Sequence, residues 1–118
     1  EYLVSPHYNQ PFIWETWRRN PEEPSFCQPQ YPFDELNVES VTLGDGTEWK
    51  YTQDHGKSGC SIISSTNDKP LVCIGDINRM FSQYNRGGGT ACFQHQNLWD
   101  AFNSAFKNHD TCGPNGVP

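Results

Sequence analysis

The segment DHGKS at residues 54–58 places an imidazole two residues before an ammonium group. In an extended backbone, side chains two residues apart point to the same side, so His55 and Lys57 are expected to share a face. Such a pair can form a phosphate site, in which the lysine binds a non-bridging oxygen and the histidine acts on phosphorus or on the leaving oxygen. The triplet by itself is a weak signal, because most such pairs are two solvated loop residues.

Further polar residues follow a predicted buried strand. The apolar run Leu71–Ile74 comes after Pro70 and is bounded by Gly75, as is typical of a strand inside a sheet. We therefore expect Asp76, Asn78 and Arg79 to emerge where this strand ends. The segment NRGGGT at residues 85–90 predicts a tight, exposed loop, in which the three glycines permit positive φ angles and close approach of the chain.

Hydrophobic patterning predicts the elements that position these residues. Residues 36–43 alternate as a half-buried strand with a possible bulge, and the turn sequence GDG leads into a second strand over residues 47–52, so a hairpin is expected. Residues 54–59 are expected to form a loop, and residues 12–17 a short strand or a turn. Apolar side chains at helical spacing predict one helix over residues 96–107.

Length, charge and hydropathy limit the class of protein. The chain has 118 residues, enough for one domain, and its low hydrophobic content of 34% predicts a modest core. The 14 acidic and 8 basic residues give a net charge of −6 at pH 7, which excludes a protein that binds nucleic acid through a basic surface at neutral pH. DNA binding in an acidic compartment stays open, because carboxylates then protonate and the 4 histidines gain charge.

The cysteines and the start of the chain indicate its compartment. Five cysteines fit an oxidising, secretory environment, and their spacing matches no common zinc pattern. An odd number leaves one thiol over. The chain opens EYLVSPHYNQ without an initiator methionine, so we expect a proteolytically processed chain or a fragment. No apolar run reaches the roughly 18 residues of a membrane span, so no membrane partner is expected.

Three regions differ in composition. Residues 1–35 are rich in proline and aromatic side chains and are predicted to be mostly irregular. Residues 36–112 carry the predicted strands, the helix and the polar motifs, and residues 113–118 are predicted to be a flexible tail. The expected fold is a mixed β-sheet flanked by helices, of the α/β (α+β) class, with disulfides that support the small core.

Four motifs together resemble the C-terminal part of the deoxyribonuclease II family. They are DHGK at 54–57, CIGDINR at 73–79, RGGGTAC at 86–92 and WDAF at 99–102. The family comprises acid, metal-independent endonucleases of lysosomes and secretions, and its catalytic unit resembles half of a phospholipase D-like pseudodimer. The likeness is strong from Gln53 to Cys112, weaker over residues 36–51 and poor over residues 1–26.

The resemblance implies roles for individual residues. His55 and Lys57 match the family's second His-x-Lys motif, in which the histidine serves catalysis and the lysine binds the scissile phosphate. Asp76 and Asn78 are expected to orient His55 or to close the phosphate site. The implied substrate-binding set is Arg79, Arg86, Gly87 and Gly88, although Arg86 could instead pair with Asp76, and the glycines are more simply a turn. His7, His95 and His109 match no motif and are expected to be surface or packing residues.

The family pattern also implies the disulfides. It pairs Cys73 with Cys92 and Cys27 with Cys112, which leaves Cys60 either as a free thiol near the site or as a link to another chain. No metal or cofactor is implied.

The resemblance implies that this chain holds half of an active site. The family site uses two His-x-Lys motifs, whereas this chain has one. A separate chain with the N-terminal half of the precursor, or a second copy, would complete it. The implied activity cleaves DNA through a phosphohistidine and leaves 3′-phosphate and 5′-hydroxyl ends, in a secreted or lysosomal protein. The alternative is a catalytically silent, disulfide-stabilised binding or toxin subunit; a lipid-cleaving enzyme of related chemistry fits the motifs less well.

Overall fold

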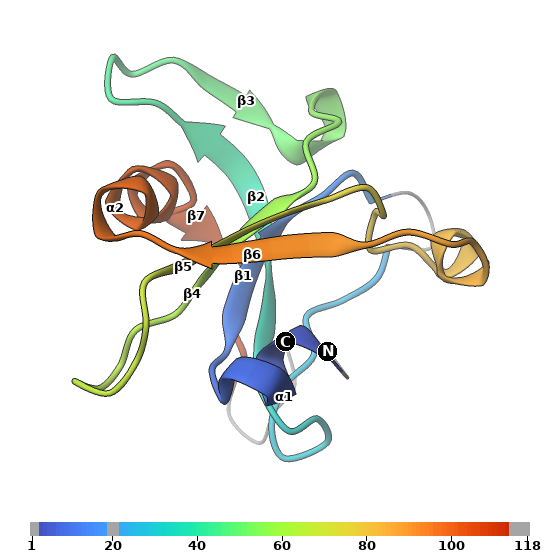
Figure 1. The fold of residues 1–118 in the computed structure, drawn as a ribbon. Coiled ribbons are helices and arrows are strands. Elements are labelled where there is room, and N and C mark those ends of the chain that lie inside the picture. Colours follow the sequence, from blue (N-terminus) through green and yellow to red (C-terminus); the bar gives the residue numbers. More distant parts are fainter. Residues whose placement is uncertain (1–2, 19–21, 114–118) are drawn as a thin grey trace.

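The computed structural model describes residues 3–18 and 22–113, which form a mixed β-sheet with two α-helices (Figure 1). The strands are β1 (Phe12–Glu15), β2 (Glu35–Thr42), β3 (Glu48–Lys50), β4 (Ser58–Ser61), β5 (Leu71–Gly75), β6 (Thr90–Gln94) and β7 (Asn108–His109). The helices are α1 (Val4–Tyr8) and α2 (Gln96–Ala105), with 3₁₀ turns at Tyr51–Gln53 and Phe81–Asn85. The predicted class, a mixed sheet with helices and disulfides, is confirmed.

The N-terminal strand lies in the middle of the sheet. The strand order is β3-β2-β1-β4-β5-β6, and β7 also pairs with β2. β1 runs parallel to β2 and antiparallel to β4. The prediction that residues 1–35 are mostly irregular is therefore wrong for α1, whereas the short strand or turn expected over residues 12–17 is observed as the strand β1. The prolines are compatible with both elements, because Pro6 lies in the first turn of α1, where backbone N–H groups have no helical partner, and Pro11 precedes β1.

Each face of the sheet is covered by one helix. Successive side chains of a strand point to opposite faces, so Phe12 and Ile13 belong to different clusters. Ile13 packs with Val38, Val41 and Phe106 beneath the apolar residues of α2. Phe12 packs with Leu71 and with the side chains of α1.

The predicted hairpin, β5 and the C-terminal helix are confirmed. β2 and β3 pair antiparallel around a turn in which Gly46 has a φ of 88°. The register of the β2–β7 pair shifts between Val38 and Ser40, where the sequence predicts a possible bulge in this strand. The helix α2 ends at Ala105, so Lys107 lies beyond it. The predicted tail falls, apart from Gly113, outside the described residues.

Three strands are absent from the sequence-based prediction, namely β4, β6 and the two-residue β7. β4 has the sequence SGCS and β6 the sequence TACFQ, and neither has the alternating apolar pattern of a typical strand. β4 forms because β1 and β5 pair with it on both sides. Gly59 of β4 is required there, since a side chain at this position would collide with the Trp14 ring.

Both predicted disulfides are confirmed. Cys73 and Cys92 are directly opposed on β5 and β6, and Cys27 is bonded to Cys112 beyond β7. Cys60 is a free thiol with no solvent exposure, and burial raises its pKa to about 12. Within the described part of the chain, no helix combines the length and the apolar character needed to cross a bilayer.

Candidate functional site

The sheet topology gathers the predicted motifs at one end of three strands. β1 and β5 both run antiparallel to β4, so the ends of β1 and β5 meet the start of β4. The register places Ser58 opposite Glu15 and Ile74, and the Gly75 N–H donates to the Lys57 carbonyl over 2.8 Å. The DHGK turn and the segment after β5 are therefore neighbours, although they are distant in sequence.

A cleft of about 700 Å³ lies at this end of the sheet. Five of the predicted site residues line it, namely His55, Lys57, Asp76, Asn78 and Arg86. The remaining wall comes from residues around the 3₁₀ turn, Met80, Phe81, Ser82 and Gln83, and from Trp17 after β1. The convergence on one cleft is what a phosphodiester site requires, namely a nucleophile or acid together with cations for the equatorial oxygens.

His55 is stacked on an aromatic ring. Its imidazole lies 4.4 Å from the Trp17 ring, centroid to centroid, with 18° between the planes. The Lys57 ammonium donates to the His55 carbonyl over 2.8 Å, so imidazole and ammonium are held on the same turn. The sequence analysis did not identify Trp17 as a site residue; the only signal was its place at the end of the short strand or turn expected over residues 12–17, two residues beyond the observed β1.

Asp76 and Asn78 bind backbone groups of neighbouring segments. Asp76 Oδ1 accepts from the Gly89 N–H over 2.8 Å, and Asn78 Oδ1 accepts from the Trp17 N–H over 3.1 Å. Asp76 therefore holds the glycine loop, whereas Asn78 holds the residue on which His55 stacks. Through Trp17, Asn78 contributes to the position of His55.

The two arginines have different environments. Arg79 is 7% exposed and donates to the Asn37 side chain and to the Pro24 carbonyl, with its guanidinium 4.8 Å from the centre of the Phe26 ring. Arg86 is exposed and lines the cleft, with Nη1 3.3 Å from Gln83 Oε1. The geometry thus favours a structural role for Arg79, and it pairs Arg86 with Gln83 rather than with Asp76.

The glycine loop requires Gly88 because its backbone lies close to the side chains of Asp76 and Ile77. A Cβ at Gly88 would lie 2.5 Å from Asp76 Oδ1 and from the Ile77 side chain, while Gly87 has open space around it. The expectation of positive φ is wrong for these glycines, because Gly46 is the glycine with positive φ in the described part of the chain. Gly88 lines, with Arg79 and Asn78, a neighbouring cleft of about 400 Å³.

Two carboxyl groups that the sequence analysis did not single out lie beneath the DHGK turn. The Gly56 N–H donates to Asp54 Oδ1 over 2.7 Å, and a side chain at Gly56 would collide with Glu15 Oε2. Glu15 is 2% exposed. Burial, with the Asp54 charge as a second cause, raises the pKa of Glu15 to about 8. A glutamate within FIWETW gives no such signal in the sequence.

The other histidines lie away from the cleft. His95 Nδ1 accepts from the Leu98 N–H over 3.2 Å and caps α2, and the His7 ring lies edge-on to Tyr8 at 4.8 Å. These are the packing and surface roles that were expected.

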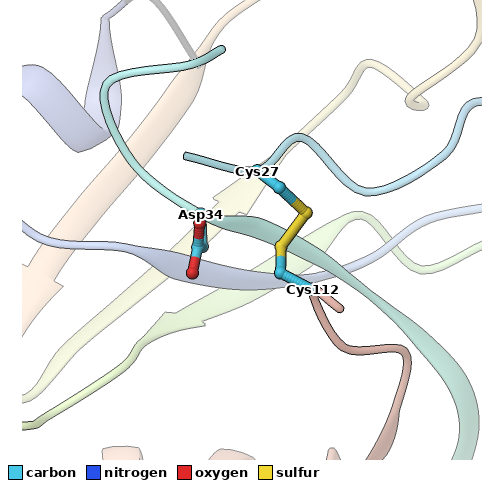
Figure 2. Close-up of side chains that lie close together, drawn as sticks. All are labelled: Cys27, Asp34 and Cys112. Atoms are coloured by element: carbon cyan, nitrogen blue, oxygen red, sulfur yellow. A yellow bond between two sulfur atoms is a disulfide. The ribbon is translucent and has the colours of Figure 1, made fainter. Parts of the chain in front are cut away.

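One group of potential metal ligands lies close together, and Figure 2 shows its members, Cys27, Asp34 and Cys112. The two sulfurs form a disulfide, so neither supplies a thiolate. Asp34 Oδ1 accepts from the Gln28 N–H over 2.9 Å. This group is therefore a disulfide with a loop-capping aspartate and not a metal centre.

The family profile of deoxyribonuclease II matches residues 1–112. The chain belongs to the deoxyribonuclease II family. The match includes residues 1–26, where the sequence analysis found little resemblance. These residues contain β1, which lies in the centre of the sheet and is therefore part of the fold.

Three relatives illustrate the range of similar proteins. Deoxyribonuclease-2 of Caenorhabditis elegans is 44% identical over 110 residues, which is 93% of this chain and 28% of the relative. A putative deoxyribonuclease-2 of Burkholderia pseudomallei is 40% identical over 84% of this chain and 27% of its own length. Plancitoxin-1 of Acanthaster planci is 30% identical over 92% of this chain and 29% of its own length. The deoxyribonuclease II-type chain thus spans less than a third of these curated relatives.

Proposed function

We propose that this chain carries one half of the active site of an acid, metal-independent endodeoxyribonuclease. The observation that carries the proposal is the cleft in which His55, Lys57 and Arg86 converge, in a chain of the deoxyribonuclease II family. Lys57 and Arg86 supply positive charge for the non-bridging oxygens of a phosphodiester, and His55 supplies the nucleophile or the acid.

The proposed reaction has two steps. In the first, a neutral imidazole attacks phosphorus, the bond from phosphorus to the 5′ oxygen breaks, and a second, protonated histidine gives its proton to that oxygen. The intermediate is a phosphohistidine on the 3′ side of the cut. In the second step water attacks phosphorus, the second histidine, now neutral, takes a proton from that water, and the bond from phosphorus to the first imidazole breaks, so the products carry 3′-phosphate and 5′-hydroxyl ends.

The second histidine comes from outside this chain. One His-x-Lys triplet is present among its 118 residues, and the chain spans 27–29% of the curated relatives described above. The remaining part of the same precursor supplies the second motif, or a second copy of the chain does. Phe81, 58% exposed on the wall of the cleft, is suited to contact such a partner.

An acidic, oxidising compartment fits this chemistry. One imidazole must be neutral while the other is protonated, which occurs most readily near or below the ordinary histidine pKa of about 6.5. The negative charge of −6 at pH 7 repels DNA and declines on acidification. The two disulfides support the proposal of a lysosomal or secreted protein, because disulfides form and persist in oxidising compartments.

Plasmid cleavage at about pH 5 with EDTA tests the proposal on the protein as isolated, with every chain it carries. His55→Ala is expected to lower cleavage by at least about 10³-fold, because the group that bonds to or protonates the reacting atoms is lost. His7→Ala is the matched control, since His7 is also an exposed histidine against an aromatic ring. Equal cleavage by His55→Ala and the wild type would contradict the proposal, as would 5′-phosphate ends.

The second candidate is a catalytically silent subunit on the same scaffold. Its support is the similarity to plancitoxin-1, a relative whose name denotes a toxin. A folded protein, complete in all its chains, that leaves plasmid DNA uncut at every pH would favour this candidate. Both candidates predict that His55→Ala folds normally, so circular dichroism does not distinguish them. The cleavage assay distinguishes them, because only the nuclease candidate predicts cleavage by the wild type and its loss in His55→Ala.

A further inference from the structure

The DHGK turn rests on a buried carboxyl group of the central strand. Glu15 is the last residue of β1 and pairs with Ser58 of β4, directly after Lys57. Its Oε2 lies so close to Gly56 that an added Cβ would collide with it. The backbone of the turn that carries His55 and Lys57 therefore packs closely against this one side chain.

Glu15 lies in surroundings that suit an uncharged carboxyl. Its side chain is 2% exposed, and among the described residues Oε1 has no hydrogen-bond partner. It borders a cavity of about 300 Å³ whose wall is mostly apolar and includes Trp49, Phe102 and Phe106. An ionised carboxylate without hydrogen-bond donors is unfavourable in such a place, so the protonated form is the stable one at acidic pH.

Three charged groups act on Glu15. Asp54 lies on the same turn, where it accepts the Gly56 N–H, and its negative charge opposes ionisation of Glu15. Lys57 of the turn and Arg18 beyond β1 act in the opposite direction. Burial outweighs both cations and, together with Asp54, raises the pKa of Glu15 from 4.5 to about 8.

We propose that Glu15 is a positioning residue, whose uncharged carboxyl holds the His55–Lys57 turn against β1 and whose ionisation beside Asp54 displaces that turn. The structural part concerns the turn alone. Its consequence for catalysis, a further loss of cleavage at pH values above the limit set by the histidines, rests on the proposed nuclease function.

The sign of the pH dependence follows from linkage. Between pH 4.5 and about 8 the folded state keeps a proton on Glu15 that the unfolded state has lost. Stability therefore falls as pH rises through this window and is fully present only below pH 4.5. Glu15→Gln keeps the shape of the side chain and is neutral at every pH, so it is expected to remove this decline in stability with rising pH.

Hydrogen exchange measures the turn without reference to activity. The peptide containing Gly56 and Lys57 is followed from about pH 6 to about pH 9 in the protein as isolated, with correction for the intrinsic exchange rate. We expect protection of this peptide to fall with a midpoint near the pKa of about 8 in the wild type, while a β5 peptide stays protected. In Glu15→Gln the profile is expected to be flat.

Glu35→Gln is the matched control. Glu35 is also a buried glutamate, 1% exposed with its pKa raised by burial, but it accepts from the Trp14 indole over 2.6 Å and lies on β2. Its variant is expected to keep the wild-type profile of the turn. A flat wild-type profile, or an unchanged profile in Glu15→Gln, would overturn the proposal.

A second pair of variants keeps the contact testable if Glu15→Gln does not fold. Gly56→Ala is expected to lower protection of the turn at every pH, because the added methyl collides with Glu15 Oε2. Adding Glu15→Ala to Gly56→Ala is expected to restore protection. Undiminished protection in Gly56→Ala, or no recovery in the double variant, would overturn the contact.

Cleavage assays then separate this proposal from the proposed function. If the nuclease function holds, protonation of the histidine pair sets the main upper pH limit, and the cleavage that remains above about pH 7 is expected to fall less steeply in Glu15→Gln than in the wild type and Glu35→Gln. Residual cleavage that falls equally steeply in Glu15→Gln and the wild type would overturn the catalytic consequence. Absence of cleavage in every variant would overturn the nuclease function, while the exchange profiles would still decide the role of Glu15.

Discussion

The two polar segments that reach the cleft, the DHGK turn and the loop over residues 76–90, are built in different ways. In the turn, residues two apart both reach the cleft, and the residue between them is held by carboxyl groups beneath. In the loop, adjacent residues separate: Asn78 lines the cleft, whereas the Arg79 guanidinium packs on Phe26 in the interior. A short motif in extended backbone therefore acts as one unit, but the residues of a long loop have to be located one by one.

This difference explains why two arginines of one loop have different roles. Arg79 bonds to Asn37 of β2, which in turn donates to the Glu23 carbonyl over 3.1 Å, so it connects segments of the interior. The exposed Arg86 side chain donates to the half-buried Gln83 side chain of its own loop and keeps its charge at the cleft. Arg79 and Arg86 carry the same charge, so charge does not distinguish their roles. Their burial does, because Arg79 is buried and Arg86 is exposed.

The largest effect is expected at the turn. Lys57→Gln removes the ammonium that lies beside His55, and loss of one such charge-stabilising group is expected to lower kcat by about 10²–10³-fold. Initial-rate assays on a short duplex measure it, with Lys50→Gln of β3 as the exposed control. A loss confined to KM would place Lys57 in binding of the ground state and would weaken the view of the turn as one catalytic unit.

An effect of another kind is expected at Arg79. Arg79→Met leaves Asn37 without its partner and removes the contact with Phe26, so we expect a loss of about 2–4 kcal/mol in the free energy of unfolding. Urea denaturation measures this change. Cleavage per folded molecule is expected to stay within about twofold of the wild type, because Arg79 does not line the main cleft and its guanidinium contacts Asn37 and Phe26 instead. A stable variant with lost cleavage would instead make Arg79 part of the substrate site.

The smallest effect is expected at Arg86. Arg86→Ala removes one exposed charge, so KM is expected to rise about 3–10-fold, and the salt dependence of log K to become less steep by about one charge. Arg86→Lys keeps the charge and is the control. Titration of DNA binding at several salt concentrations measures both. An unchanged salt slope would show that Arg86 does not contact phosphate.

The sequence predicts those parts of the fold that local patterns determine. The β2–β3 hairpin, β5 and α2 follow from alternation, turn residues and helical spacing. β4 does not, because SGCS forms a strand only through pairing with β1 and β5. The disulfides followed from the family resemblance, since spacing alone allows several pairings.

The site was predictable to the same degree. His55 and Lys57 share a motif and were found together with their cleft neighbours. Trp17 and Glu15 come from the other side of a β-pairing some forty residues away, so no local pattern marks them. The role of Arg79 could not be predicted because the motif that contains it does not reveal that its side chain is buried.

The position of β1 relative to the disulfides has a consequence for limited proteolysis. The Cys27–Cys112 bond closes residues 27–112 into one covalent ring, and residues 1–26 contain no cysteine. β1 nevertheless lies between β2 and β4 of that ring. A single cut between β1 and Cys27 would separate the central strand from this ring, and the contacts within residues 1–118 that still hold it would be sheet pairing and packing. Reductant would leave it bound in the folded protein, whereas denaturant would release it and take away the residue under the DHGK turn.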